Sequence, residues 1–307
     1  MQHEKLVYGG AACLAIIWIC SAGETRAARN HNLHINFDGD HCSDLKVRSD
    51  GEVAQAAETF TLSRAEAPIL EIADTAGHSA LRVRGSDRSD FLVEVCRVAA
   101  ADDRGTADAA LRGISVSRTA GRFSTAGPAS ENVSWQLYFI VHAPRNARLD
   151  LETKNGPIDV RDISGNLKLR ATNGPISLRE CAGQVDAITL NGPISFSGGG
   201  GEVQLLARNG PISLELVGDV WNGSQLQART QNGPVSLSLP DTFRSGVRIE
   251  TDGNGPLSCG SPMCRNAWTN AASRERTLQM NGSQDTIRIT SHNGPVSVSG
   301  SKKGRRI

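Results

Sequence analysis

The sequence predicts an all-β fold in which short coils of the chain stack on one another. The first observation is a repeat, because Asn-Gly-Pro followed by Ile, Val or Leu occurs seven times. The second is an alternation of apolar and polar residues on both sides of each triplet. The third is the composition, with only 4% aromatic residues, so that Ile, Val and Leu must form the core. A fixed period in this range is the signature of stacked repeat units.

The seven copies of the triplet define one coil each. They begin at Asn155, Asn173, Asn191, Asn209, Asn232, Asn254 and Asn293. The first four copies are 18 residues apart, and the later intervals are longer, with a large excursion at 261–276 before the last copy. These lengths place two short strands and two corners in each coil.

Apolar residues recur at fixed positions around each Asn. Three residues after it stand Ile158, Ile176, Ile194, Ile212, Val235, Leu257 and Val296. Six residues before it, in every copy except that of Asn254, stand Leu149, Leu167, Val185, Val203, Leu226 and Ile287. Polar residues, mostly Ser, alternate with the apolar ones, which predicts strands with one buried face. In the Asn254 copy the apolar residues Val247 and Ile249 are shifted by one, which predicts a bulge near Asp252-Gly253.

Proline decides how these strands pair. Asn-Gly between alternating strands is normally a strong hairpin signal. The third residue here is always Pro, which lacks the amide that closes a two-residue hairpin. Each strand is therefore expected to pair with the same strand of the next coil. At the corner we expect unusual backbone angles at Asn and Gly, and hydrogen bonds between stacked Asn side chains.

The region before the repeats, 28–145, lacks the triplet but contains strand-like runs. Examples of these runs are Ile69–Ile72, Leu81–Arg84, Phe91–Val95, Gly113–Ser117 and Ser134–His142. One stretch, Ala101–Leu111, has the composition of a helix. We expect an irregular β-rich cap that covers the open end of the stack, because a bare terminal coil is an unpaired edge. The repeat domain then spans 146–300, and 301–307 form a basic tail.

The first 27 residues have the features of a secretory signal peptide. A charged start precedes an almost wholly apolar stretch, Leu6–Cys20, and small residues precede Ala28. An uncleaved membrane anchor and lipidation at Cys20 are the alternatives. Export permits disulfides. Cys259 with Cys264 can close a small loop, Cys42 with Cys96 could tie the first segment of the mature chain to the body, and Cys181 is left over.

Several function classes find little support in the composition. The net charge of +1 offers no electrostatic case for binding nucleic acid. No paired carboxylates recur on neighbouring coils, as a glycan-cleaving site requires. His31, His34, Asp38, Asp40 and His41 could bind metal, but no fixed spacing is visible among them, so a polar N-terminal segment is the preferred interpretation. The sequence predicts no cofactor.

Two sets of residues remain as candidate contact sites. The serines that follow the corners could form a binding strip for sugar or peptide, although Ser is also ordinary on a solvated strand. Trp221 and Trp268 lie on the two longest excursions between repeats. Loops on rigid scaffolds commonly carry binding residues.

A family resemblance rests on four features of the sequence. They are the seven Asn-Gly-Pro corners, the Leu149-x-Leu151-x-Thr153 run, the stretch from Val83-Arg-Gly-Ser-Asp87 to Ile114-Ser-Val116, and the Ala143-Pro144 entry. Over about residues 69–300 the chain resembles the family of exported bacterial proteins called putative adhesins. The resemblance implies a right-handed parallel β-solenoid, here of about seven coils, at the cell envelope. It implies no reaction and no binding residues.

Three functions are carried forward from the sequence. The first is an exported, non-catalytic cell-envelope protein, an adhesin or surface scaffold that binds an unidentified glycan, peptide or protein in the periplasm, at the surface or outside the cell. The second is a glycan-active enzyme that uses the excursion loops. The third is an envelope-stress sensor that binds a peptide or lipid. Contact with the membrane is expected only through an uncleaved N-terminal anchor.

Overall fold

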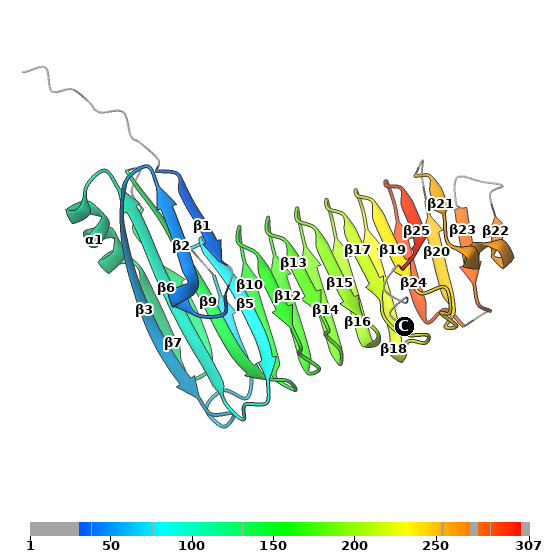
Figure 1. Ribbon diagram of the computed structural model, residues 1–307, viewed down its shortest axis with the longest axis horizontal. Helices are drawn as coiled ribbons and strands as arrows, with labels where there is room; N and C mark the ends of the chain where they lie inside the picture. The colour runs from blue at the N-terminus through cyan, green and yellow to red at the C-terminus, as the bar shows by residue number, and fades with distance from the viewer. Residues whose placement is uncertain are drawn as a thin grey trace, which may run out of the picture.

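The computed structural model describes an elongated, almost wholly β protein (Figure 1). It covers residues 31–37, 39–74, 76–129, 132–252, 255–270, 276–282 and 284–301. The predicted signal peptide, Asn254 and the basic tail after Ser301 therefore lie outside the described residues. Within these ranges no helix has the length and apolar character needed to cross a bilayer.

Two long sheets form the body, and each runs along the long axis of the molecule (Figure 1). In spatial order the twelve-stranded sheet contains β22 (Trp268–Asn270), β23 (Arg276–Met280), β20 (Val247–Thr251), β24 (Ile287–Ser291), β18 (Asn222–Thr230), β16 (Gly200–Ala207), β14 (Gln184–Thr189), β12 (Asn166–Ala171), β10 (Arg148–Thr153), β4 (Leu70–Ala73), β8 (Arg122–Ala126) and β7 (Ser115–Thr119). The eleven-stranded sheet contains β21 (Leu257–Cys259), β25 (Val296–Gly300), β19 (Val235–Leu239), β17 (Ile212–Leu216), β15 (Ile194–Gly198), β13 (Ile176–Arg179), β11 (Ile158–Arg161), β5 (Ser79–Ser86), β9 (Val133–Pro144), β6 (Phe91–Ala101) and β3 (Glu52–Leu62).

The remaining elements are short. A separate antiparallel hairpin consists of β1 (Leu33–Phe37) and β2 (Leu45–Ser49). The helices are α1 (Arg104–Gly113) and the 3-10 turns η1 (Cys42–Asp44) and η2 (Pro262–Asn266). The expected helix at 101–111 is thus confirmed with both its start and its end shifted toward the C-terminus, and Asp103 caps it by accepting from the Thr106 amide.

Successive strands of the repeat alternate between the two sheets, and we call one such pair of strands a layer. In the layer that contains Asn173, β12 pairs in parallel with β10 and β14, and β13 pairs in parallel with β11 and β15. Equivalent residues pair directly, as Ile176 does with Ile158 and Ile194. Parallel pairing with the neighbouring layer, predicted from the Pro at each corner, is therefore confirmed.

The core contains the predicted inward positions of both sheets. Ile158, Ile176, Ile194, Ile212, Val235 and Val296 are at most 1% exposed, and all belong to one hydrophobic cluster. The shifted copy also faces inward, because Val247 and Ile249 pair with Ile287 and Ile289. Gly253, where we expected the compensating bulge, lies outside the described residues.

The Asn side chains at the corners form the predicted hydrogen-bonded column. Each Nδ2 donates to Oδ1 of the Asn in the adjoining layer at 2.8–3.0 Å. The column joins Asn155, Asn173, Asn191, Asn209, Asn232 and Asn293, and Asn155 ends it by donating to the carbonyl of Gly77. Where a Thr or Ser stands two residues before the corner Asn, its inward hydroxyl donates to a backbone carbonyl, as Thr153 does to the carbonyl of Gly156 at 2.8 Å. This satisfies backbone that the corner would otherwise leave unpaired.

The corner Gly is required for a reason other than the one expected. Among the described corners, neither Asn nor Gly has a positive φ. A Cβ on Gly174, however, would lie 2.0 Å from the carbonyl oxygen of Gly156, and one on Gly192 would lie 2.0 Å from that of Gly174. The expectation of unusual backbone angles is wrong, and close approach of stacked corners is the constraint.

The order of the layers departs from the order of the chain. The strands that flank Asn293, β24 and β25, lie between the layer of β18 and β19 and the layer of β20 and β21. The last repeat thus lies between the layers of the two repeats that precede it in the sequence. Strict stacking in chain order, which the repeat suggested, is wrong for this layer.

The two sheets continue across residue 145 into the N-terminal region. There β4 and β5 pair in parallel with β10 and β11, and β8 and β9 pair in parallel with β4 and β5. Beyond them, β6 and β3 complete one sheet with antiparallel pairing, and α1 contacts these strands at the end of the molecule (Figure 1). A region expected to be irregular therefore contributes two further parallel layers, because Leu81 and Val83 supply the same inward pattern without the triplet.

Candidate functional site

The outer face of the eleven-stranded sheet carries a column of serine side chains. One residue after each inward Ile or Val, the pairing brings together Ser177, Ser195, Ser213, Ser236 and Ser297. Two residues further along each strand stand Arg161, Arg179, Ser197, Glu215, Ser238 and Ser299. Because neighbouring strands lie about 4.8 Å apart, these side chains form two rows of polar groups at regular spacing.

Part of this face is hollowed into a groove of about 750 Å³. We call it the serine groove. Its polar lining is Arg161, Ser177, Arg179, Glu180, Ser195, Ser197, Ser213, Glu215, Ser236, Ser238 and Ser299. Each hydroxyl can donate one hydrogen bond and accept others. The groove therefore offers a repeated set of hydrogen-bonding groups along the stack.

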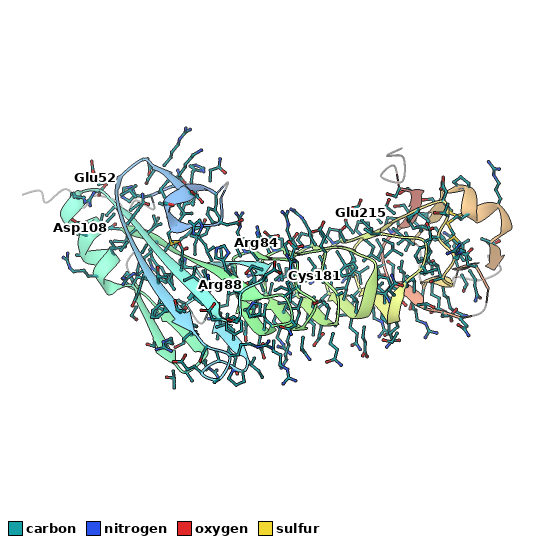
Figure 2. The ribbon with its side chains drawn as sticks, turned by 60° about the horizontal axis from the view of Figure 1, so that its bottom comes forward. Glu52, Arg84, Arg88, Asp108, Cys181 and Glu215 are labelled. Carbon is teal, nitrogen blue, oxygen red and sulfur yellow. A yellow bond between two sulfur atoms is a disulfide. The ribbon has the colours of Figure 1, made fainter. Side chains whose placement is uncertain are left out.

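Two arginines, Arg161 and Arg179, lie toward the N-terminal end of the groove, where Glu180 also lies. Within the described residues, neither Arg161 nor Arg179 has an ion pair, whereas the neighbouring Arg84 is paired with Asp40 at 3.0 Å and Asp159 at 2.7 Å. Figure 2 shows the side chains along the stack, with Arg84 toward one end of this stretch and Glu215 further along it. The guanidinium groups of Arg161 and Arg179 are thus available to an acidic group of a ligand.

The hairpin of β1 and β2 covers the next part of the same face. The guanidinium carbon of Arg82, on β5, lies 3.9 Å from the centre of the Phe37 ring, and Arg82 also donates to the carbonyls of Phe37 and Gly39. Burial, together with the positive charge of Arg84, lowers the pKa of Arg82. The hairpin lies beside Arg82 and Arg84, one strand before the groove begins at Arg161.

Trp221 does not have the exposure expected of a contact residue. It is only 5% exposed, its ring centre lies 6.2 Å from that of Phe196, and Nε1 donates to the carbonyl of Gly201 at 3.1 Å. The longer excursion carries the ring back into the core of the stack. Its burial contradicts the proposed contact role, since a buried ring offers almost no surface to a ligand.

The second Trp and the cysteines are placed as follows. Trp268 begins β22, which pairs antiparallel with β23 at the end of the stack, and its side chain lies outside what the structure describes. Disulfides join Cys42 to Cys96 and Cys259 to Cys264, the two pairs that the sequence predicts. Cys181 is free and buried, and burial raises its pKa to about 11.

The histidines near the N-terminus do not converge on one another. His31 is buried beside Asp50, 3.3 Å away, and Asp102, 3.5 Å away, whereas His34 is exposed on β1. His41 instead meets Glu94 of β6 and His142 of β9. The sequence offers no signal for this meeting, because the three residues are distant in the chain and follow no motif.

Comparison with known proteins gives only distant similarity. No protein-family model matches the chain, and no curated protein matches it. Among solved structures it is similar to a putative cell adhesion protein from Clostridium sporogenes, with 10% identity, coverage of 81% of this chain and 100% of that chain, and a TM-score of 0.32. A putative adhesin from Parabacteroides merdae has 8% identity, covers 82% and 93% of the two chains and has a TM-score of 0.36. A putative lipid binding protein from Parabacteroides distasonis has 10% identity, coverage of 81% and 98%, and a TM-score of 0.35. At these values the similarity carries no functional argument.

Proposed function

We propose that this chain is an exported, non-catalytic cell-envelope protein that binds an extended acidic glycan along the serine groove. The observation that carries the proposal is the groove itself, with its rows of hydroxyls and the two guanidinium groups of Arg161 and Arg179. In this role the protein acts as an adhesin or a surface scaffold.

The architecture suits such a role. We propose that the stacked layers form a right-handed β-solenoid of the kind found in the putative adhesin family. In-register parallel strands support this, as does the continuous column of corner Asn residues. A rod of this kind presents a periodic row of polar groups along its length. A repeating polymer is a natural ligand for a repeating surface.

Export is supported by the cysteines. Cys42–Cys96 and Cys259–Cys264 are paired, and disulfides persist mainly outside the reducing cytosol. We propose that residues 1–27 direct export and that the mature protein resides in the periplasm, at the cell surface or outside the cell. Cell fractionation with an antibody against the mature chain tests this, and recovery in the cytosol would contradict it.

A glycan fits the groove better than an apolar ligand does. Hydroxyls and guanidinium groups form hydrogen bonds with sugar hydroxyls and carboxylates, whereas a fatty acyl chain would leave those groups unpaired. The inward residues of the same strands, such as Phe196 and Leu214, are buried and add little apolar surface. The arginine end of the groove favours a ligand that carries negative charge.

The binding test uses the mature chain, polygalacturonate as an acidic polymer and dextran as a neutral one. We expect saturable binding of polygalacturonate in isothermal titration calorimetry and much weaker binding of dextran. Ser213→Trp, which fills the middle of the groove, should abolish binding. Gln204→Trp, on the outer face of the opposite sheet, is the matched control and should bind as the unmodified chain does. Equal binding by both variants would contradict the groove as the site.

A second candidate function follows from two carboxylates in the groove. Glu180 follows β13 and Glu215 lies on β17, two strand spacings away, so their backbones are separated by roughly 10 Å. In inverting glycosidases the two carboxyl groups lie about 6.5–9.5 Å apart, a separation that side chains on backbones this far apart can adopt. Incubation with a panel of polysaccharides distinguishes the alternatives. Release of reducing ends that Glu215→Gln abolishes would favour an enzyme over a binding protein.

The third candidate, a sensor of a peptide or lipid, has its own test. Sedimentation of the mature chain with vesicles of phosphatidylglycerol and phosphatidylcholine measures lipid binding. Binding to these vesicles that survives Ser213→Trp, without any binding of polygalacturonate, would favour this candidate. Under the proposal, the protein stays in solution when the vesicles are pelleted.

A further inference from the structure

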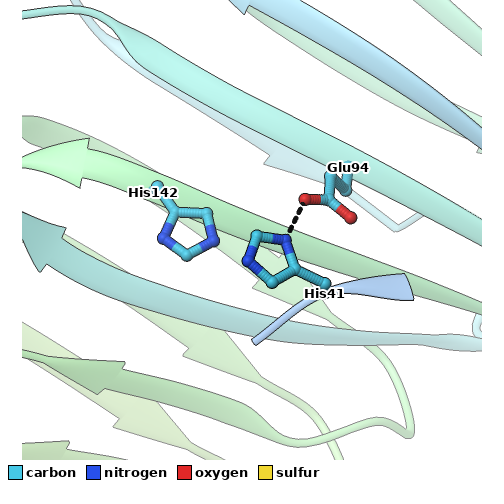
Figure 3. Close-up of side chains that lie close together, drawn as sticks. All are labelled: His41, Glu94 and His142. Carbon is cyan, nitrogen blue, oxygen red and sulfur yellow. Dashed lines mark hydrogen bonds and ion pairs between the residues drawn. The ribbon is translucent and has the colours of Figure 1, made fainter. Parts of the chain in front are cut away.

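Three side chains with metal-binding donor atoms meet on the outer face of the sheet, beside the β1–β2 hairpin. They are His41, Glu94 and His142, and one donor atom from each lies within 4.8 Å of the others (Figure 3). His41 Nδ1 and Glu94 Oε1 are 2.6 Å apart. The group lies outside the serine groove, and the function proposed above does not use it.

The sheet places two members of this group. Glu94 on β6 and His142 on β9 project from the outer face of adjacent antiparallel strands, where Leu92 is paired with His142. They are therefore diagonal neighbours on one surface, within reach of each other's side chains. Strands of the sheet are rigid supports for a site.

The hairpin loop supplies the third member and is tied down beside the other two. Cys42, the residue after His41 in the loop, forms a disulfide with Cys96 of β6. The amide of Cys42 donates to Glu94 Oε2 at 3.0 Å, so that the carboxylate is oriented by the loop as well. The rings of His41 and His142 are stacked with centres 5.3 Å apart. The constellation is thus held by covalent and hydrogen bonds of the protein alone.

Other groups around the site add further oxygen atoms. His142 Nε2 lies 3.0 Å from the carbonyl oxygen of Asp40, and the Asp40 carboxylate is paired with Arg84. Asp44 accepts from the amide of His41. Hydrogen bonds of this kind from neighbouring backbone and carboxylates orient ligating histidines in metal sites.

We propose that His41, Glu94 and His142 form a binding site for Zn²⁺. Two imidazole nitrogens with one carboxylate oxygen are a donor set that zinc accepts, and imidazole disfavours Ca²⁺ and Mg²⁺, which prefer oxygen alone. His41 is 57% exposed and Glu94 is 13% exposed, so the site opens to solvent on one side and leaves a fourth position for water.

Zinc binding requires a small rearrangement. Ligand bonds of about 2.0–2.2 Å bring donor atoms to roughly 3.3 Å from one another, so no separation within the group needs to shorten by more than about 1.5 Å. The exposed ring of His41 can make most of this movement by side-chain rotation. Zinc also takes the place of any proton shared between His41 and Glu94, because ligating imidazole is neutral and ligating carboxylate is ionised.

The experiment titrates ZnCl₂ into the mature chain, made without a polyhistidine tag, in a calorimeter. We expect one Zn²⁺ per chain with a dissociation constant in the micromolar range or below, and no heat from CaCl₂. His142→Ala and Glu94→Gln should each weaken zinc binding at least about tenfold, the loss that even supporting residues of metal sites cause. His292→Ala is the matched control, because His292 is an exposed histidine paired with Asp252 at the other end of the molecule.

Two further measurements distinguish a loss of zinc binding from a loss of folding. Zinc should raise the melting temperature of the unmodified chain and of His292→Ala, and leave that of His142→Ala unchanged, while all three melt at similar temperatures in EDTA. Co²⁺ bound to the unmodified chain should show the visible absorption of a four-coordinate site, which His142→Ala loses. Absence of saturable one-to-one binding, or equal loss in His292→Ala and His142→Ala, would overturn the proposal.

Discussion

Asn293 donates a hydrogen bond from Nδ2 to Oδ1 of Asn232 over 3.0 Å, although 61 residues separate the two in the chain. The repeat that lies between them in sequence, that of Asn254, is displaced to the far side of the last layer. The last strands therefore pair on both sides, β24 with β18 and β20, and β25 with β19 and β21. Among the described residues, β20 and β21 therefore join the rest of the two sheets through β24 and β25. We infer that the stability of this terminal layer depends on these two strands.

The first prediction concerns this inserted layer. Ile289 is fully buried on β24, so Ile289→Ala should destabilise the protein by about 2–4 kcal/mol through a cavity. Hydrogen exchange should accelerate in 247–280 more than in 149–171, because β20 loses support from its parallel partner. Mass spectrometry of peptides from both regions measures the difference. Arg288→Ala, at the exposed neighbour, should change neither region, and uniform acceleration would contradict the inferred dependence.

The second prediction tests which face of the strand is buried. Ile194 is 0% exposed in the core, whereas the adjacent Ser195 is exposed. Ile194→Asp should destabilise the chain by more than about 3 kcal/mol, since the carboxylate has no partner there. Ser195→Asp should cost less than about 0.5 kcal/mol, as surface substitutions do. Urea unfolding compares them, and equal midpoints would refute the assigned face.

The third prediction concerns the close approach of the corners. Gly174→Ala places a methyl group against the carbonyl of Gly156 and should cost about 1–3 kcal/mol, or prevent that layer from stacking. Gly113→Ala is the matched control, because a Cβ there has only ordinary contacts with Pro128 and φ is not positive. Thermal unfolding of both variants gives the measurement. A harmless Gly174→Ala would show that the corners can separate without cost.

The fourth prediction measures the Asn column. Asn191 donates to Asn173 and accepts from Asn209, so Asn191→Ala removes two hydrogen bonds at once. Both are exposed to water, which places the expected loss near about 1 kcal/mol, toward the low end for two bonds. Thr172→Ala, an exposed neighbour of Asn173, should be nearly neutral. A variant as stable as the unmodified chain would mean that water replaces the column fully.

The fifth prediction concerns the free thiol. Burial raises the pKa of Cys181 to about 11, so the reactive thiolate is scarce at neutral pH as well as hidden from reagents. In the mature chain, iodoacetamide should leave Cys181 unmodified under native conditions and alkylate it in urea. Mass spectrometry of the tryptic peptide is the readout. Native labelling as fast as that of an unfolded chain would contradict its burial in the stack.

The sequence predicted the repeating part of the fold because its signals are local. Alternation around Ile176 and Ile194 specifies which side chains face inward, and Pro after each Asn-Gly excludes the competing hairpin. The prediction for Trp221 was wrong, because a residue on an excursion was expected to be exposed, whereas its ring packs beside Phe196. The local pattern also missed strand β3, whose three Ala and two Glu residues have little preference for strands and which pairs along its full length with β6.

By itself, the sequence determined the corners, the inward spine and parallel pairing between layers, since each follows from neighbouring residues. It offered the two disulfide pairs only as possibilities, and the structure decided them. Only the tertiary structure decided that the Asn293 layer lies between those of Asn232 and Asn254. Equivalent strands offer nearly the same pattern to any neighbour, so their order depends on the packing of the whole stack. The same holds for the meeting of His41, Glu94 and His142, because a sheet and a disulfide, not a motif, bring these distant side chains together.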